Sequence, residues 1–345
     1  MKHYQLILAA ALVALAACNK GKVDNLNTAS DNEIGFNAVA SMNTKAIISG
    51  TTYGTENSFK VWGWQSQKGD FSEFATAAAS NFMSNLTISH TKGADEEHHD
   101  FAWRNADHYY YWPFTGKISF LAIHPSSVTP STTGWNATTD IPEATFANYT
   151  IASTNETVDL MFATNFSARR TDALNIVFKH ALSQIEVSVK TDKDYSNDVA
   201  FDVESVTFKN IDLSGNVTYS NNTISWADNT DQDENWVYYD TVLEDIDDEY
   251  QVYGAAKVTI PQPANVLDPG ATPDPDTVQT IITIGYSMEQ TGSAKITGTV
   301  DVAVPTLWEA GKKYNYTINF RLNEILFNPT VDNWVDVNVS TINIY

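Results

Sequence analysis

Apolar and polar residues alternate at several places along this chain, which is the pattern of β-strands with one buried face. The clearest case is residues 314–320, where aromatic residues and Ile alternate with Asn and Thr. In residues 185–189, three aliphatic residues alternate with Glu and Ser. Near the start of the chain, Ile34, Phe36 and Ala38 alternate with Gly and Asn. Each segment predicts a strand whose apolar side chains face a core.

Further segments carry the same signature over shorter stretches. They are residues 59–64, 82–89, 117–124, 201–208, 258–260, 280–286 and 296–304. Within 201–208 the apolar phase shifts along the strand. The alanine-rich residues 71–80 are the one predicted helix, and the Pro-, Asp- and Gly-rich residues 267–276 predict a surface loop. Many short strands separated by turn residues predict an all-β fold of β-sandwiches.

The end of the chain shows two strand phases in succession. Its apolar positions are Val335, Val337, Val339, Ile342 and Ile344. The three valines share one phase and the two isoleucines take the other. A bulge or turn near residues 340–341 would account for the slip.

The start of the chain is a continuous apolar run. Every residue from Leu6 to Ala17 is Leu, Ile, Val or Ala. A membrane-spanning helix needs about 20 such residues, so the shorter run predicts a signal peptide over residues 1–17. It ends in Leu-Ala-Ala-Cys18, which resembles a bacterial lipobox. We therefore expect Cys18 to carry lipid in the outer membrane and residues 18–45 to form a tether that contains the first strand.

The charge balance, the cysteine count and the length of the chain limit the class of protein. The chain has 20 basic and 42 acidic side chains, a formal net charge of −22. Nucleic-acid binding needs clustered Lys and Arg, so this balance excludes a nucleic-acid partner and suits a surface protein. The chain's one cysteine is used for lipid, which excludes disulfides and thiolate chemistry. The 345 residues suit about two domains, which we expect at 46–172 and 173–345.

The acidic and histidine-rich stretches resemble metal sites only superficially. Residues 95–100 read Asp-Glu-Glu-His-His-Asp, but neighbouring strand residues point to opposite faces, so a solvated hairpin tip explains them better. Between residues 210 and 256 there is no Lys or Arg, and Asp231 and Asp233 have calcium-loop spacing. Trp236 replaces the glycine that such a loop needs, so we expect acidic surface loops and no metal.

No motif supports catalysis or a cofactor. The chain has no nucleophile elbow, no phosphate loop and no defensible carboxylate pair, and His180 beside a hydrophobic strand suits a structural role. We therefore expect that the protein is not an enzyme and uses no cofactor. The aromatic residues 109–112, which follow His108, either stack on sugars or pack alternately into a core.

A series of short motifs occurs in one order along the chain. They are Ile34-Gly35-Phe36, Thr44-Lys45-Ala46, residues 59–64, Tyr111-Trp112-Pro113, residues 118–125, 159–163, 178–183, 307–314 and 331–334. Each is weak alone. Together, behind a lipobox, the series resembles the fimbrillin family of gut and oral Gram-negative bacteria, over most of the mature chain.

The resemblance implies two tandem transthyretin-like β-sandwich domains in a subunit of a fimbria, or pilus. Such subunits are exported as lipoproteins, and a protease then removes the first strand. The open groove accepts a strand from another fimbrial subunit by β-strand addition. The donor strand implied here is the C-terminal segment that holds Val335, Val337, Val339, Ile342 and Ile344.

The resemblance departs from the family at the processing site. The best-known members are cut after an arginine, whereas the aligned residues here are Lys45-Ala46 and the first arginine is Arg104. Either another protease cuts after Lys45, or the subunit stays unprocessed as an anchor or cap. Thr241 and Thr277, both in Asp-Thr-Val, resemble O-glycosylation acceptors of these bacteria.

Three functions agree with these observations. The first is a structural fimbrial subunit that supports adhesion. The second is a stand-alone surface lipoprotein that binds glycan, and the third is a tip adhesin of the fimbria that binds a host protein or glycan.

Overall fold

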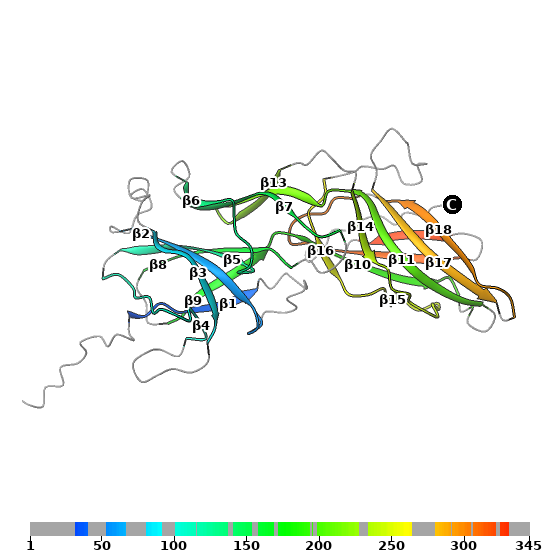
Figure 1. Cartoon of the computed structure of the whole chain (residues 1–345), viewed down its shortest axis with the longest axis horizontal. Coiled ribbons are helices and arrows are strands. Elements are labelled where there is room, and N and C mark those ends of the chain that lie inside the picture. Colours follow the sequence, from blue (N-terminus) through cyan, green and yellow to red (C-terminus); the bar gives the residue numbers. More distant parts are fainter. Residues whose placement is uncertain are drawn as a thin grey trace, which may run out of the picture.

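The structure is a computed structural model of the chain, and Figure 1 shows an elongated molecule built from β-strands. It describes residues 32–40, 53–66, 81–91, 101–114, 116–136, 141–153, 158–168, 172–193, 195, 199–227, 234–263, 280–290, 292–304, 306–321 and 325–330. These residues form twenty strands and no α-helix, which confirms the predicted all-β class. Among them, no helix has the length and apolar character needed to cross a membrane.

Seven strands pair into one closed sheet, on the left of Figure 1. In sheet order they are β1 (Phe36–Ala40), β4 (Trp103–Arg104), β3 (Asn81–His90), β2 (Ser58–Ser66), β5 (Lys117–His124), β8 (Met161–Ala168) and β9 (Leu174–His180). Phe59, Phe120 and Phe178 are fully buried in its interior. On the same strands, Trp62 and Leu121 belong to a larger hydrophobic cluster on the outside. Strand β5 is therefore buried on both faces, and its residues 120–123 form a continuous apolar run, as is typical of such a strand.

A four-stranded sheet covers part of the outside of the closed sheet and joins distant parts of the chain. Its order is β13 (Thr223–Ala227), β12 (Ser214–Ser220), β7 (Ile141–Thr150) and β6 (Thr132–Asn136). Tyr219 of β12 stacks on Phe162 of β8 with ring centroids 5.0 Å apart, and its hydroxyl lies 3.2 Å from that of Thr164. The β12–β13 hairpin therefore ties the later half of the chain to the earlier half.

The remaining strands form two facing sheets, on the right of Figure 1. One has the order β15 (Gln251–Val252), β10 (Ser183–Thr191), β19 (Lys313–Phe320) and β20 (Ile325–Thr330), with β16 (Lys257–Thr259) also beside β10. The other has the order β14 (Glu234–Tyr239), β11 (Val199–Ile211), β17 (Ile281–Gln290) and β18 (Ile296–Ala303). Phe208 of β11 packs on Tyr316 of β19, with ring centroids 5.6 Å apart. The aromatic side chains of the two sheets thus share one core, which confirms the predicted sandwich.

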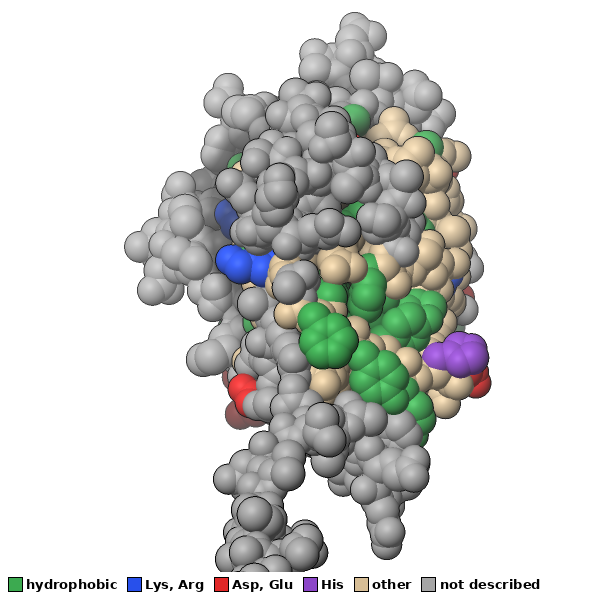
Figure 2. Space-filling view, turned by 90° about the vertical axis from the view of Figure 1, so that its left-hand side faces the viewer, with side chains coloured by type: hydrophobic (Ala, Val, Ile, Leu, Met, Phe, Trp, Pro, Cys, Tyr) green, Lys and Arg blue, Asp and Glu red, His purple; other side chains and the backbone are tan. Residues whose placement is uncertain are grey.

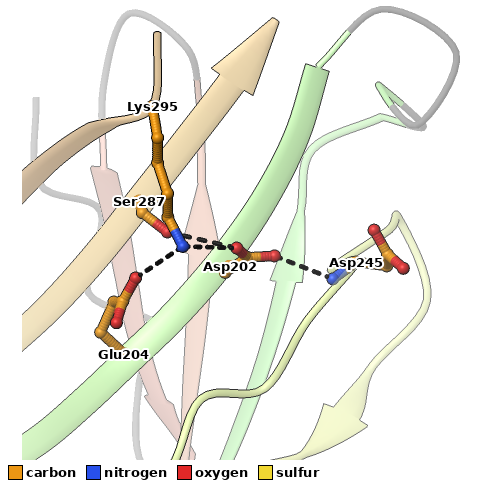
Figure 3. Close-up of polar contacts among 5 residues, drawn as sticks. All are labelled: Asp202, Glu204, Asp245, Ser287 and Lys295. Atoms are coloured by element: carbon orange, nitrogen blue, oxygen red, sulfur yellow. Dashed lines mark hydrogen bonds and ion pairs between the residues drawn. The ribbon is translucent and has the colours of Figure 1, made fainter. Parts of the chain in front are cut away.

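The phase shift expected within residues 201–208 is present in β11. Its register against β17 shifts between Val203 and Ser205, so Glu204 is an extra residue in the ladder. Figure 3 shows the ion pairs beside this register shift. Lys295 Nζ lies 3.1 Å from Glu204 Oε1 and 3.3 Å from Asp202 Oδ2. Together these carboxylates raise the pKa of Lys295.

Asp202 is held in place by two further hydrogen bonds (Figure 3). Ser287 Oγ donates to Asp202 Oδ2 at 3.2 Å, and the backbone N–H of Asp245 donates to Asp202 Oδ1 at 3.1 Å. The cluster joins the β17–β18 hairpin and the loop at Asp245 to β11. It fixes the register of the bulged strand at this end of the sandwich.

Several sequence predictions fall on residues beyond those that the structure describes. They are the helix at 71–80, the loop at 267–276 and the strand segments at 335–344. The division at 172 and the count of two transthyretin-like domains stay predictions. β9 pairs with β1 and β8, and the β12–β13 hairpin pairs with β7, so strands from both sides of residue 172 share sheets.

The packing of Tyr219 yields a stability prediction. Tyr219→Ala should lower the free energy of unfolding by about 3 to 5 kcal/mol, because a buried ring is lost and a cavity is left. Tyr219→Phe keeps the ring and should cost only about 1 to 2 kcal/mol, because it loses the hydroxyl's hydrogen bonds with Thr164 and Asn222. Urea denaturation of both variants is the measurement. Equal losses in the two variants would contradict the assigned stacking on Phe162.

Candidate functional site

The first strand, meaning β1 with the extended residues just before it, closes the seven-stranded sheet. Ile34, Phe36 and Ala38 all point into the sheet and are buried. The Phe36 ring makes edge contacts with Phe59 and Phe120, at centroid distances of 6.1 and 5.7 Å. The strand and its apolar inward face are as the alternation predicts.

The two edges of the first strand are held very differently. Toward β9, five residue pairs join the strands in parallel, from Phe36 with Leu174 to Ala40 with Phe178. On the opposite edge, the described residues show two pairs, Phe36 with Trp103 of β4 and Glu33 with Tyr111. The backbone of the strand is therefore fixed mainly from one side, by a parallel ladder, which is slightly less stable per residue than an antiparallel one.

A loop of residues 105–114 holds the start of the first strand. The backbone N–H of Ile34 donates to the carbonyl of Tyr110 at 2.7 Å. The backbone N–H of Trp112 donates to the carbonyl of Asn32 at 2.6 Å. These bonds continue the closed sheet for a short distance beyond β1.

An open pocket of about 330 Å³ lies beside the first strand. It is lined by Phe36, Asn37, Phe101, Ala102, Asp172, Ala173 and Asn175. At Gly35 the backbone approaches the Phe101 ring so closely that an added Cβ would lie 2.0 Å from it. The first strand therefore packs tightly against Phe101 at Gly35. Along its outer edge, beside the pocket, it is only partly covered.

Two buried polar pairs lie in the core of the same sheet. The hydroxyl of Tyr53 lies 2.5 Å from His124 Nδ1, and His180 Nδ1 is hydrogen-bonded to Asp159 Oδ2. All four side chains are at most 3% exposed. Burial raises the pKa of Tyr53 and lowers that of His124, although the carbonyl of Ser58 partly opposes the shift at His124. Both groups are therefore uncharged at neutral pH, and we interpret the pairs as structural.

Sequence reasoning missed the pairing of Tyr53 with His124, because the two residues are 71 positions apart and no local pattern links them. It placed His180 correctly beside a hydrophobic strand, and the structure buries that side chain against Asp159. Of the alternatives for the aromatic residues 109–112, core packing holds for Trp112, which is buried, whereas Tyr111 is 37% exposed. Sugar stacking stays a prediction.

Most of the predicted site residues fall outside the described part of the chain. They are Cys18, Lys45, Ala46, Thr277, Val335, Val337, Val339, Ile342 and Ile344. Thr241 is described, and it lies exposed after β14, where its carbonyl accepts a hydrogen bond from Tyr253. Residues 95–100, Asp231 and Asp233 are also outside the description, and the described residues hold no group of three or more potential metal ligands.

Comparison with known proteins decides the family. The model of the fimbrillin-like family matches residues 44–334. The chain belongs to the fimbrillin-like family. Membership supports a role as a fimbrial subunit at the cell surface, in contact with other fimbrial subunits. The resemblance read from the ordered motifs is therefore confirmed.

Solved structures agree with this fold. A fimbrial protein from Bacteroides vulgatus superposes with a TM-score of 0.61 at 17% identity, covering 88% of this chain and 100% of that one. A candidate cell adhesion protein from Bacteroides ovatus gives 0.52 at 12% identity, covering 90% and 100%. One from Bacteroides uniformis gives 0.50 at 16% identity, covering 88% and 99%. A comparison with curated protein sequences found no match.

The seating of Phe36 can be tested in the full-length chain. Phe36→Ala should lower the free energy of unfolding by about 3 to 5 kcal/mol, because the ring fills the core between Phe59 and Phe120. Asn37→Ala, on the exposed face of the same strand, should change it by no more than about 0.5 kcal/mol. Denaturant titration of both variants is the measurement. An equal loss of unfolding free energy in Asn37→Ala and Phe36→Ala would contradict the assignment.

The lowered pKa of His124 predicts a pH dependence of stability. The unfolded chain binds a proton at His124 near pH 6.5, whereas the folded chain resists it, so stability is complete above this pH and falls as the pH drops. One proton can contribute at most about 1.4 kcal/mol per pH unit. His124→Gln should therefore flatten the fall in stability between pH 7.5 and 5.5, measured by urea denaturation. An unchanged slope would show that other groups cause it.

Proposed function

We propose that this fimbrillin-like chain is a structural subunit of a cell-surface fimbria that assembles by β-strand addition and supports adhesion. The observation that carries the proposal is the first strand. It fills a core with three apolar side chains, yet its backbone is held mainly by a ladder on one edge. Such a strand can be exchanged without dismantling the strands around it.

Removal of the first strand would leave an open groove, which is unfavourable until another strand fills it. Each fully buried Ile or Phe side chain is worth roughly 1.5 to 3 kcal/mol. The vacated edge of β9 would also expose a row of backbone N–H and C=O groups. A strand with alternating apolar residues restores both kinds of contact. The C-terminal segment with Val335, Val337, Val339, Ile342 and Ile344 has that pattern, and we propose it as the donor.

Export and processing complete the proposal. Residues 1–17 would be removed as a signal peptide, and lipid on Cys18 would hold the precursor at the outer membrane. Cleavage between Lys45 and Ala46 would then release the lipid together with the first strand. Without cleavage, the same molecule would remain on the membrane as an anchor subunit or a solitary lipoprotein.

Two tandem transthyretin-like domains form part of the same proposal. The core inside the closed sheet is a cluster of its own, which supports one unit there, while the larger cluster contains outward side chains of β2, β5 and β8 as well as the core of the facing sheets. The pairing of β9 with β1 favours a boundary after β9, later than the expected position at residue 172. Thr241 and Thr277 are proposed as O-glycosylation sites. We propose no catalytic activity, cofactor or nucleic-acid partner.

The processing step is tested in the native bacterium with two matched substitutions. Lys45→Ala should abolish filaments and leave the subunit in the membrane, because the first strand then stays in its groove. Lys22→Ala lies in the same tether and should behave like wild type. N-terminal sequencing of purified fimbriae should give a chain that begins at Ala46. Normal filaments from Lys45→Ala cells, or filaments built from lipidated chains, would contradict the proposal.

Electron microscopy with antibody labelling separates the remaining alternatives. Continuous labelling along filaments identifies a stalk subunit. Labelling at filament ends identifies a tip adhesin, and diffuse labelling of cells without filaments identifies a stand-alone lipoprotein, for which glycan binding is the leading alternative.

A further inference from the structure

The loop of residues 105–114 presents exposed aromatic side chains at the far end of the closed sheet. Phe114 is 90% exposed and Tyr111 is 37% exposed, and together we call them the aromatic tip. Figure 2, which views the molecule from the left-hand side of Figure 1, shows hydrophobic side chains gathered on the surface there. Exposing a Phe side chain so fully has a cost in water, so this surface is a candidate for an interface.

The loop that carries the aromatic tip is anchored by a buried tryptophan and by hydrogen bonds within the loop. Trp112 is buried and makes an edge contact with Phe120 at a centroid distance of 5.8 Å. The side-chain oxygen of Asn105 accepts hydrogen bonds from the backbone of Asp107 and His108, at 3.2 and 2.9 Å. The loop therefore has a defined shape, and its aromatic tip is held in place instead of collapsing into the core.

The aromatic tip adjoins the groove of the first strand. Tyr110 and Trp112, which flank Tyr111, hold Ile34 and Asn32 by backbone hydrogen bonds. A strand that takes the place of the first strand would inherit these bonds. Tyr111 itself pairs with Glu33, so one end of the replacing strand would lie beside the aromatic tip in either polarity.

We propose that the aromatic tip is a docking platform for the C-terminal segment, residues 331–345, of a second copy of this chain. The proposal rests on the strand exchange proposed above and extends the interface beyond the groove. It assigns to Tyr111 and Phe114 a part of the contact between subunits that the donor strand alone does not make.

The composition of the C-terminal segment fits this platform. Its alternating Val and Ile residues are preceded by Trp334 and followed by Tyr345. One of these two rings would therefore reach the aromatic tip in either polarity of the donor strand. Aromatic pairs contribute about 0.5 to 1.5 kcal/mol beyond the area that they bury.

Charge does not oppose this occupant. Residues 331–345 carry Asp332 and Asp336 and no Lys or Arg. The loop of the aromatic tip contains Asp107 and begins beside Arg104, which lies over the Tyr109 ring at 4.6 Å. Copies with a net charge of −22 repel one another, so an apolar platform is a more suitable place for them to meet than an acidic surface.

Disulfide trapping in assembled fimbriae tests the platform directly. The only native cysteine, Cys18, lies before the proposed cleavage site, so processed subunits give no background. Phe114→Cys is combined with Trp334→Cys or with Tyr345→Cys. One of the two combinations should give a ladder of linked subunits on non-reducing gels, and the combination that links also reports the polarity of the donor strand.

A matched control places the cysteine at the other end of the groove. Val177 of β9 is 50% exposed and pairs with Val39, far along the first strand from the aromatic tip. The C-terminal cysteine that links to position 114 should not link to Val177→Cys. Equal linking to both positions, or no linking to position 114 in filaments that do form, would overturn the proposal.

A second measurement uses substitutions that leave the core intact. Phe114→Ala should still be processed to begin at Ala46, but its filaments should dissociate on the order of tenfold faster, as is typical when an aromatic anchor is truncated. Phe114→Tyr should restore wild-type dissociation. If Phe114→Ala filaments are as durable as wild type, the platform is wrong while strand exchange stands.

Two other outcomes are also decisive. If no processed subunits or filaments form in the wild type, strand exchange itself fails and the platform falls with it. If a glycan array shows binding to the monomer that Phe114→Ala abolishes, with filament durability unchanged, the aromatic tip is a glycan site and the docking proposal is overturned.

Discussion

The closed sheet depends on one contact, the Phe36 ring set between Phe59 and Phe120. The Phe36 ring completes a core that the side chains of the other six strands fill only in part. Because β1 carries three inward side chains and one main backbone ladder, its place is defined by packing more than by hydrogen bonding. Under the proposed strand exchange, a donor strand would need inward side chains of matching pattern and a backbone that restores the ladder to β9.

Local alternation was sufficient to find the strands that have one buried face. It located β1, β2, β10 and β19 because their inward side chains repeat every second residue. It missed β6, β12 and β13, where the alternation covers only two apolar residues in β12 and two in β13, and β12 pairs with the distant β7. Their pairing is a property of the folded topology, so no window of sequence could have revealed it.

The candidate site was predicted only in part. The inward face of the first strand followed from its alternation, whereas exchange of that strand, which the family resemblance implies, stays a prediction. The neighbours of the strand could not be predicted, because Phe36 pairs with Leu174 and Ile34 bonds to Tyr110, over separations that sequence periodicity cannot bridge. The aromatic run 109–112 was ambiguous for a physical reason: Trp112 turns inward and Tyr111 outward, so core packing describes only part of the run.

The division of the core decides how much of the molecule strand exchange disturbs. Ile34, Phe36 and Ala38 all belong to the cluster inside the closed sheet. The outward side chains of β2, β5 and β8 belong to the other cluster, which the β12–β13 hairpin covers through the stacking of Tyr219 on Phe162. If the first strand is lost, as proposed, one core would open and the other would stay closed. The outer cluster would then hold β2, β5 and β8 in position while the groove is empty, so that the proposed donor strand would meet a preformed site at little ordering cost.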